Sequence, residues 1–466
     1  MVFSSLTFLF LYLPLTLLVY FLSPLRWRNF VLLVVSLLFY GWGEPVYIVI
    51  MFLSIIIDYT HGLLVEKFRS DDKKARWFVA QSVIFNLALL GFFKYWDFIA
   101  ANLSLIPGID LPQLGIPLPI GISFYTFQAL SYTVDVWRGD VPAQRSFAKF
   151  LLYISLFPQL IAGPIVRYAD VAGQIDARSF DAADAFYGAT RFCIGLAKKV
   201  LLADAAGKVA AQILDGSAAS ATTAAAWLGI VLYTFEIYFD FSGYSDMAIG
   251  MGWMLGFHFD ENFRYPFVSR SIAEFWQRWH ISLGTFFRDY LLYVPIFGKR
   301  RKYVSLFLVW FCTGFWHGAS WNYILWGLYF GLFIFIETLV GKKRMKRIPA
   351  PLAHLYALLV IVVGFGIFKF ENLTDLGLFF KGLVGANGNP FLDPVSETAI
   401  LQNLFLILGA ALLSMPILPA IKKFVAKTTT RTAVAGAVTM VTNVGLVISS
   451  IMLIDTMNNP FLYFRF

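Results

Sequence analysis

Residues 315–321 read FWHGASW and place a histidine between two tryptophans, inside an almost wholly apolar run over residues 303–340. A run of this length is enough for two helical crossings of a bilayer, since each needs about 20 apolar residues. A second tryptophan-rich stretch, EFWQRWH, occupies residues 274–280. The chain has five histidines, and His280 and His317 lie in these two stretches. We predict that the two segments form an active site inside a membrane protein.

The composition supports a membrane location for the whole chain. Of 466 residues, 59% are hydrophobic and 14% are charged, whereas soluble domains carry about 25% charged residues. The apolar residues recur in runs of about 20, as in membrane-spanning helices. The sequence therefore predicts an all-α polytopic protein surrounded by a lipid bilayer.

Charged residues indicate how the chain is threaded through the membrane. The net charge is +9, and the basic residues cluster in short loops such as 66–76, 299–302 and 342–347. Cytoplasmic loops are enriched in Lys and Arg, so this is a topology signal rather than the footprint of a nucleic acid, and we expect no nucleic-acid partner. Loop 102–119 has no Lys or Arg and should face outward. Alternation of the spans places both termini outside.

Two regions depart from simple spanning helices. Residues 147–166 contain Phe157-Pro158 and Ala162-Gly163-Pro164, which predict a bent or re-entrant element. Residues 240–301 are too polar for lipid-facing helices, and we expect short, partly re-entrant helices that line an internal chamber. No soluble domain or linker is apparent. Residues 1–466 are interpreted as one membrane domain with an aromatic C-terminal tail, residues 458–466.

The chemistry of His317 suits proton transfer. A neutral imidazole is tolerated at membrane depth, and its pKa near neutrality suits a general base. Gly314 and Gly318 leave room for other groups to approach the ring. His280 is expected on a helical stretch one turn after Trp276. For both histidines, the alternative is a structural role in hydrogen bonding between helices.

Charged residues within the apolar sequence require partners, because a charge at bilayer depth costs a few kcal/mol. Asp240 and Asp246 either line a polar chamber or hold basic side chains; Arg264, Arg270 and Arg278 are the candidates. Glu274 and Arg278 are spaced i,i+4 and should neutralise each other.

Signatures of other enzyme classes are missing from the sequence. It contains no P-loop, G-x-S-x-G or H-E-x-x-H motif, and no Cys/His set with zinc spacing. Cys193 and Cys312 are expected as buried apolar side chains. We predict no metal site and no cofactor. Haem held by two histidines is a disfavoured alternative, because the surroundings of His280 and His317 are unlike.

These motifs resemble the membrane-bound O-acyltransferases, and within them the bacterial alginate O-acetyltransferase branch. The resemblance rests on EFWQRWHISL (274–283), RDYL (288–291), GFWHGA (314–319), PIGISFYTF (119–127) and YFDFSGYSDMAIG (238–250). It implies about eleven or more transmembrane or re-entrant helices around a central chamber, with a funnel on each side meeting at the histidine.

The resemblance also implies an activity and partners. His317 corresponds to the catalytic histidine of the family and His280 to its second active-site position. The donor would be cytoplasmic acetyl-CoA, bound as a substrate. The acetyl group would cross the bacterial inner membrane to an SGNH-like, esterase-like partner in the periplasm or anchored to the membrane. The acceptor would be an exported polysaccharide: alginate or a related exopolysaccharide first, peptidoglycan second. Both termini would then be periplasmic.

We expect Trp316, Trp276, Asp246 and Tyr463 to contact substrate. Tyr463 lies in the final hexapeptide FLYFRF, which resembles a C-terminal aromatic motif of such acyltransfer systems. The tail is predicted to enter the exterior funnel, where the Tyr463 hydroxyl accepts acetyl transiently or helps to seat the partner. The alternative is an aromatic anchor at the membrane interface.

Two other functions compete with the acyltransferase. A transporter or flippase of an export complex would predict internal repeats, and none is visible in the sequence. A non-catalytic scaffold would leave two histidines at membrane depth without a purpose.

Overall fold

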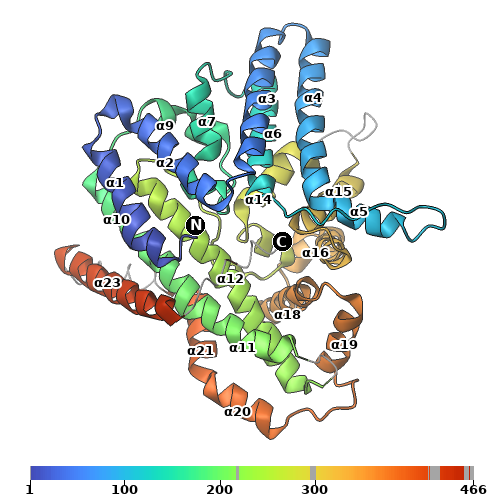
Figure 1. Ribbon diagram of the computed structural model, residues 1–466. Helices are drawn as coiled ribbons and strands as arrows, with labels where there is room; N and C mark the ends of the chain where they lie inside the picture. Colours follow the sequence, from blue (N-terminus) through green and yellow to red (C-terminus); the bar gives the residue numbers. More distant parts are fainter. Residues whose placement is uncertain are drawn as a thin grey trace. The chain divides into compact units, whose positions relative to one another are not determined.

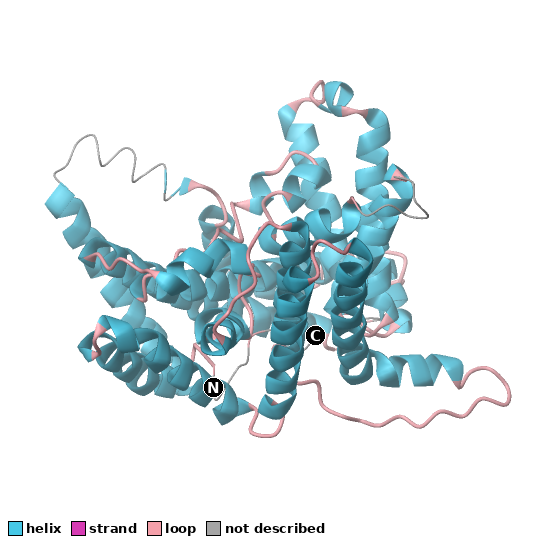
Figure 2. Ribbon diagram, turned by 90° about the horizontal axis from the view of Figure 1, so that it is seen from above, coloured by secondary structure: helices cyan, strands magenta, loops and turns pink. Residues whose placement is uncertain are grey.

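The computed structural model describes residues 2–216, 220–293, 301–417, 419, 431–455 and 461. Helices and the loops that connect them account for all of this part of the chain, and no strand occurs in it (Figure 2). The prediction of an all-α protein is confirmed. The chain divides into two compact units: Met1–Phe192 with Ser245–Asp260, and Cys193–Tyr244 with Glu261–Phe466. They are called the first and the second unit below, and each is described by itself.

The first unit contains the N-terminal helices (Figure 1). A π-helical turn, Phe8–Tyr12, leads into α1. The helices are α1 (Leu13–Leu22), α2 (Arg28–Gly43), α3 (Ile48–Lys67), α4 (Asp72–Leu90), α5 (Trp96–Leu103), α6 (Ile122–Arg138), α7 (Phe147–Ser155), α8 (Phe157–Leu160), α9 (Tyr168–Asp176) and the start of α10 (Ala182–Ala197). The predicted break at Phe157-Pro158 is confirmed, because proline has no N–H with which to continue the ladder of α7.

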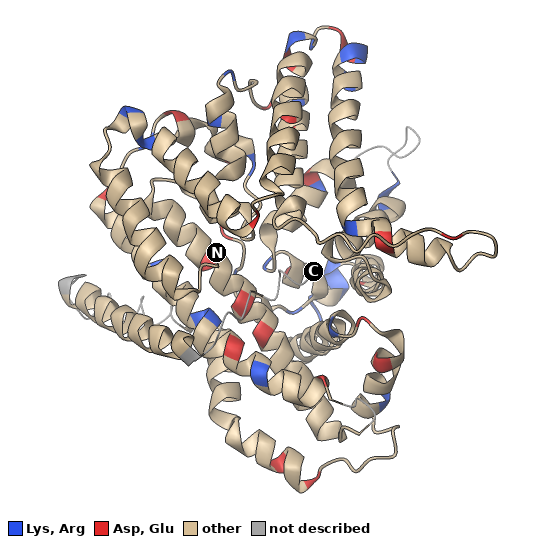
Figure 3. Cartoon of the chain, in the orientation of Figure 1, with Lys and Arg blue, Asp and Glu red and all other residues tan. Residues whose placement is uncertain are grey.

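Helices α3, α4 and α6 pack side by side around a buried polar cluster (Figure 1). The carboxylate of Asp58 on α3 accepts hydrogen bonds from Ser82 Oγ (2.6 Å) and Asn86 Nδ2 (2.9 Å) on α4. Such side-chain bonds hold apolar helices together in a membrane, where helix association gains little from the hydrophobic effect. The basic residues of segment 66–76 lie at the end of α3, in the short connection and in the first turns of α4, and Lys and Arg are coloured in Figure 3.

The second unit contains the remaining helices. In chain order these are the end of α10, a π-helical stretch (Lys198–Ala203), α11 (Asp204–Leu214), α12 (Thr223–Met254), α13 (Ile272–Trp276), α14 (Ile281–Phe287), α15 (Lys302–His317), α16 (Trp321–Val340), α17 (Lys342–Met345), α18 (Ala350–Lys369), α19 (Leu373–Leu383), α20 (Pro394–Gln402), α21 (Leu404–Leu413) and α23 (Arg431–Asp455). The last residues of α12 return to the first unit.

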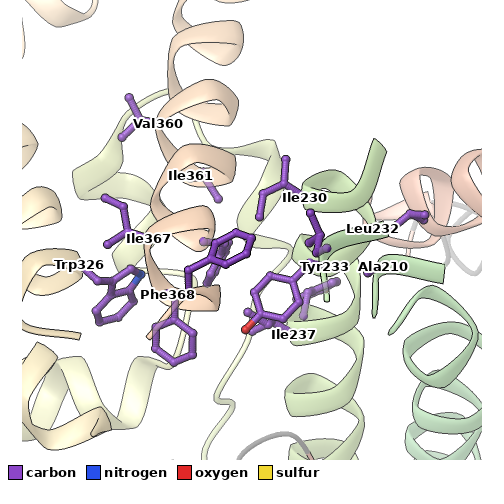
Figure 4. Close-up of a cluster of buried hydrophobic side chains, with 14 of the residues drawn as sticks. Ala210, Ile230, Leu232, Tyr233, Ile237, Trp326, Val360, Ile361, Ile367 and Phe368 are labelled. Carbon is purple, nitrogen blue, oxygen red and sulfur yellow. The ribbon is translucent and has the colours of Figure 1, made fainter. Parts of the chain in front are cut away.

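A continuous apolar core joins α11, α12, α16 and α18 of the second unit. Figure 4 shows part of it, with Tyr233 of α12, Trp326 of α16 and Phe368 of α18 among the labelled side chains. Trp326 is 1% exposed. The same core contains Phe275 and Trp279, so it reaches the tryptophan-rich stretch 274–280.

Among the described residues, six helices are long and apolar enough to cross a membrane: Ile48–Lys67, Asp72–Leu103, Thr223–Met254, Trp321–Val340, Ala350–Lys369 and Ala433–Ile454. The pair α20 and α21, bent by 50°, brings the count to seven if it forms one span. The chain is thus a membrane protein, but the expected count of eleven or more is not confirmed. Other apolar helices are shorter than a span: α2, α6 and α15 have 16, 17 and 16 residues. The single-domain interpretation and the central chamber stay predictions.

The polar block over residues 240–301 only partly matches its prediction. Its first part is not a set of short helices, because α12 continues unbroken through the motif at 238–250. Gly243 does not break the helix; a Cβ there would lie 2.7 Å from the carbonyl oxygen of Gly195, so glycine permits a close approach. Beyond Met254, the chain does form short helices, as predicted.

Candidate active site

His317 is the last residue of α15 and is 7% exposed. Gly318 follows in an extended conformation and ends the helix, and α16 begins at Trp321. Residues 303–340 thus form two helices, and His317 lies at the turn between them.

Glycines bring α15 and α16 close together near this turn. A Cβ on Gly314 would overlap the carbonyl oxygen of Tyr323, and a Cβ on Gly327 would overlap that of Trp310. A Cβ on Gly318 would overlap the Tyr323 ring. Small residues at such positions are the usual means by which membrane helices reach contact distance. The two glycines thus permit the close approach of α16, and the approach of other groups to the imidazole stays a prediction.

Aromatic rings surround the imidazole of His317. Its centroid lies 5.1 Å from the Trp316 ring, 4.9 Å from the Trp326 ring and 5.4 Å from the Phe368 ring. Trp326 and Phe368 are labelled in Figure 4, and their rings are 5.2 Å apart. Because these rings exclude water, charges and hydrogen bonds at His317 act in a medium of low dielectric constant.

The structure corrects the prediction for the backbone of His280. Instead of lying within a helix, His280 is the residue before α14 and has left-handed dihedral angles, φ 44° and ψ 54°. This conformation costs a non-glycine residue roughly 1–2 kcal/mol. Helical spacing alone did not reveal the change of direction between Trp276 and His280. Strained backbone of this kind clusters at functional sites.

Asn262 fixes the orientation of the His280 ring. Its Oδ1 lies 3.1 Å from His280 Nδ1 and also accepts from the Ser282 backbone N–H (3.2 Å) and hydroxyl (2.9 Å). Since an atom that accepts from a backbone N–H is the amide oxygen, Nδ1 carries the ring proton. Nε2 then holds the lone pair. His280 lies outside the six candidate spans, and burial lowers its pKa to about 3.

Trp316 brings the two histidines together. Its ring centroid is 6.0 Å from that of His280 and 5.1 Å from that of His317. Phe241 of α12 contacts the other side of the site, at 4.6 Å from the His280 ring. Two segments separated by more than thirty residues of sequence thus converge around one indole.

Trp276 lies in the same aromatic cluster, with its centroid 5.5 Å from that of Trp326. Two side chains position α13, which ends at Trp276. The Ser271 hydroxyl accepts from the Glu274 backbone N–H (3.0 Å), and Glu337 of α16 accepts from the backbone N–H groups of Ile272 (2.6 Å) and Ala273 (2.9 Å). Satisfying these free N–H groups stabilises the start of a helix.

The charged side chains find partners, but not all of the expected ones. Glu274 and Arg278 form the predicted ion pair, at 3.0 Å. Asp240 pairs with Lys199 (2.6 Å), and Asp246 pairs with Arg191 (2.8 Å). The expectation that these acids hold Arg264, Arg270 or Arg278 is therefore wrong. Lys199 and Arg191 precede α12 by a whole helix, and no spacing rule connects them to it.

Asp246 and Tyr463 are the other two predicted site residues. Asp246 belongs to the first unit, whereas both histidines belong to the second. Tyr463 lies outside the described residues. Its neighbour Phe461 is 1% exposed, and its ring packs 4.4 Å from the Tyr244 ring and 5.0 Å from Lys199 Nζ. Sequence reasoning missed Asn262, Glu337 and Trp326. A signal existed for Glu337, which is a charged residue within an apolar run, whereas no spacing or motif singles out Asn262 or Trp326.

No group of three or more His, Cys, Asp and Glu side chains suited to a metal ion occurs among the described residues. The arrangement at His317 is instead one imidazole in an aromatic enclosure with a second, oriented imidazole nearby. Such a site can accept and return a proton away from water.

Comparisons with known proteins agree with this chemistry. A model of the membrane-bound O-acyltransferase family matches residues 46–376. The chain is 42% identical to a probable alginate O-acetylase of Azotobacter vinelandii, over 80% of this chain and 76% of that protein. It is also 42% identical to the Pseudomonas aeruginosa counterpart, over 80% and 73%. A peptidoglycan O-acetyltransferase of Helicobacter pylori is 32% identical over 87% and 85%. On this evidence, the chain belongs to the membrane-bound O-acyltransferase family and is an acyltransferase.

Proposed function

We propose that this acyltransferase O-acetylates an exported polysaccharide of a bacterium. It takes acetyl groups from cytoplasmic acetyl-CoA and passes them across the inner membrane to a periplasmic or membrane-anchored, SGNH-like partner. The observation that carries the proposal is the convergence of His280 and His317 on Trp316. The relatives, which O-acetylate alginate or peptidoglycan by name, support the reaction class.

His317 acts as the general base of the transfer. A hydroxyl oxygen attacks the thioester carbonyl carbon while the His317 imidazole takes the hydroxyl proton. The carbonyl electron pair moves to oxygen and forms a tetrahedral oxyanion. Collapse re-forms the carbonyl and breaks the carbon–sulfur bond, and the imidazolium returns its proton to the sulfur. The products are an acetyl ester and free CoA, and base catalysis of this kind contributes about 10²–10⁴-fold.

His280 supports this step rather than taking the proton itself. With a pKa of about 3, its ring stays neutral at physiological pH. A base this weak accepts a proton poorly. Asn262 holds the tautomer in which Nε2 is an acceptor, so His280 orients a hydroxyl or another hydrogen-bond donor at the site. His317 therefore carries the base role.

The placement of His317 along α15 supports transfer across the membrane. Helix α15 begins at Lys302, beside the basic stretch 299–302, and ends at His317. Fifteen residues at 1.5 Å each separate the two by about 22 Å along the helix axis. The basic end faces the cytoplasm if the positive-inside bias holds, so His317 lies most of the way towards the periplasm. With this orientation of α15, the alternation of spans places both termini in the periplasm.

The polymer and the final acceptor follow from the same proposal. Alginate or a related exopolysaccharide is the first choice of polymer, and peptidoglycan is the second, in the order of the identities quoted above. Trp316 and Trp276 contact the acyl group, and Asp246 contributes to substrate binding. Tyr463 accepts acetyl transiently or seats the partner. Phe461, buried against Tyr244, supports a docked tail.

The first test is thioester turnover by the purified protein. Acetyl-CoA should be consumed with release of free CoA, and His317→Ala should reduce the rate by at least 10²-fold, because the base is lost. His258→Ala is the matched control, since His258 is exposed and pairs with Asp184 at 3.4 Å in the first unit. Polymer export that continues without CoA release would instead favour the transporter.

A further inference from the structure

A buried hydrogen-bond donor next to His317 has no partner among the residues that the structure describes. It is the indole N–H of Trp326, on a side chain that is 1% exposed. The centroid of the Trp326 ring is 4.9 Å from that of the His317 ring, so the donor belongs to a side chain that packs against the reacting imidazole. Trp276 has a second buried N–H of this kind, one ring further from His317.

An unpaired buried donor is unusual and unfavourable. Native structures pair about 90% or more of their buried polar groups, and each exception requires an explanation. An indole N–H removed from water without an acceptor loses its hydration and gains no hydrogen bond in return. Contacts between an N–H group and an aromatic face are weaker and compensate only partly. A ligand atom that accepts a hydrogen bond from this N–H during the reaction would explain why a tryptophan is present here.

The surroundings hold Trp326 firmly in place. Its ring packs against Phe330 (5.4 Å) and Phe368 (5.2 Å). One turn earlier on α16, Asn322 donates through Nδ2 to the carbonyl oxygen of Phe368 at 3.0 Å. Helices α16 and α18 are thereby fixed to each other at this level. The N–H is thus preorganised and needs no reorientation when charge develops nearby.

We propose that the indole N–H of Trp326 donates a hydrogen bond to the oxyanion formed from the acyl carbonyl at His317. This inference rests on the proposed transfer from acetyl-CoA. As the acceptor hydroxyl attacks, the carbonyl oxygen gains negative charge and becomes a stronger acceptor than in the thioester. The bond is therefore stronger in the transition state than in the ground state, which is the condition for catalysis. In an enclosure lined by aromatic rings, such a donor is worth far more than in water.

The test combines one side-chain atom with one substrate atom. Trp326→Phe removes the N–H and keeps an aromatic ring. With acetyl-CoA, kcat should fall by about 10²-fold and KM should change little, as for other oxyanion donors. The dithioester analogue of acetyl-CoA replaces the carbonyl oxygen with sulfur, a weaker acceptor. With this analogue, the kcat of wild type and that of Trp326→Phe should differ by less than about tenfold, because the donor's contribution of about 10²-fold depends on that oxygen.

Trp310→Phe is the matched control. Trp310 lies in the same cluster, 4.7 Å from the Trp276 ring, and the substitution removes the same atoms. It should affect both substrates equally. Should Trp326→Phe fold poorly, benzothienylalanine at position 326 replaces N–H with sulfur at nearly constant shape.

The outcomes separate this inference from the proposed function. Release of CoA by wild type but not by His317→Ala would support the function. If the Trp326 variants then lose the same factor of activity with both substrates, or lose no activity, the oxyanion role is wrong while the function stands. If wild type does not turn over acetyl-CoA, the function itself fails. Selective loss with the oxygen substrate supports the donor.

Discussion

His280 combines two properties that an isolated residue would avoid: a left-handed backbone and a fully buried imidazole. Asn262 compensates for the second by accepting from Nδ1, and the neighbouring Phe241 and Trp316 rings enclose the remainder. The strained turn aims the side chain at the site from a segment that would otherwise continue α13. The strained backbone at His280 thus costs stability but places the His280 ring in the site.

The buried state of His280 makes stability depend on pH. Its pKa is about 3 in the folded protein, against 6.5 for an imidazole exposed to water, so the unfolded chain binds more protons between these values. Stability is fully present above pH 6.5 and falls as the pH decreases from 6.5 towards 3. His280→Asn removes the titration, and asparagine tolerates the left-handed backbone. Thermal melts between pH 7.5 and 5 should fall more steeply for wild type; equal slopes would contradict the burial of a neutral ring.

At the scale of elements, the α15–α16 hairpin depends on two glycines at its closest approach. Any side chain at Gly314 or Gly327 would meet backbone atoms, which cannot rotate away. Because His317 and Trp326 lie on the two helices of this hairpin, the separation of the helices also sets the geometry of the site.

We expect Gly314→Ala to push α15 and α16 apart. The cost should be about 1–3 kcal/mol, the usual range for overpacking, and acetyl transfer should fall with it. Gly409→Ala on α21 is the matched control, since no atom lies within 4 Å of a Cβ there. Melting temperature and CoA release report both effects. Equal behaviour of the two variants would show that the hairpin has room to spare.

At the scale of the whole molecule, the charge pattern assigns each loop to one side of the membrane. Loop 102–119 has no basic residue, whereas residues 342–347 are rich in Lys and Arg. Leu105 in the first loop is 81% exposed, and Lys343 in the second is also exposed. Each position therefore offers an accessible site for chemical labelling.

Cysteine labelling of intact cells tests this topology. In a chain with Cys193 and Cys312 replaced by serine, an impermeant maleimide should label Leu105→Cys without permeabilisation. Lys343→Cys should react only after the inner membrane is opened, because basic loops stay in the cytoplasm. The opposite pattern would invert the proposed direction of acetyl transfer.

The sequence by itself determined the membrane class, the helical fold, the helix breaks at prolines and the two histidine segments. These features depend on local composition, on runs of about 20 apolar residues and on the absence of a proline N–H. The motifs at 274–283 and 314–319 also pointed to the family before any contact was known.

Only the tertiary structure decided how these segments meet. The left-handed turn at His280, its bond to Asn262 and the enclosure of His317 by Trp326 and Phe368 join residues that are 9 to 51 positions apart. The partners of Asp240 and Asp246 are equally non-local. Sequence periodicity reports which face of a helix is apolar, but not which other helix covers it. The site around His317 depends on which helices cover each other, and the tertiary structure decides this.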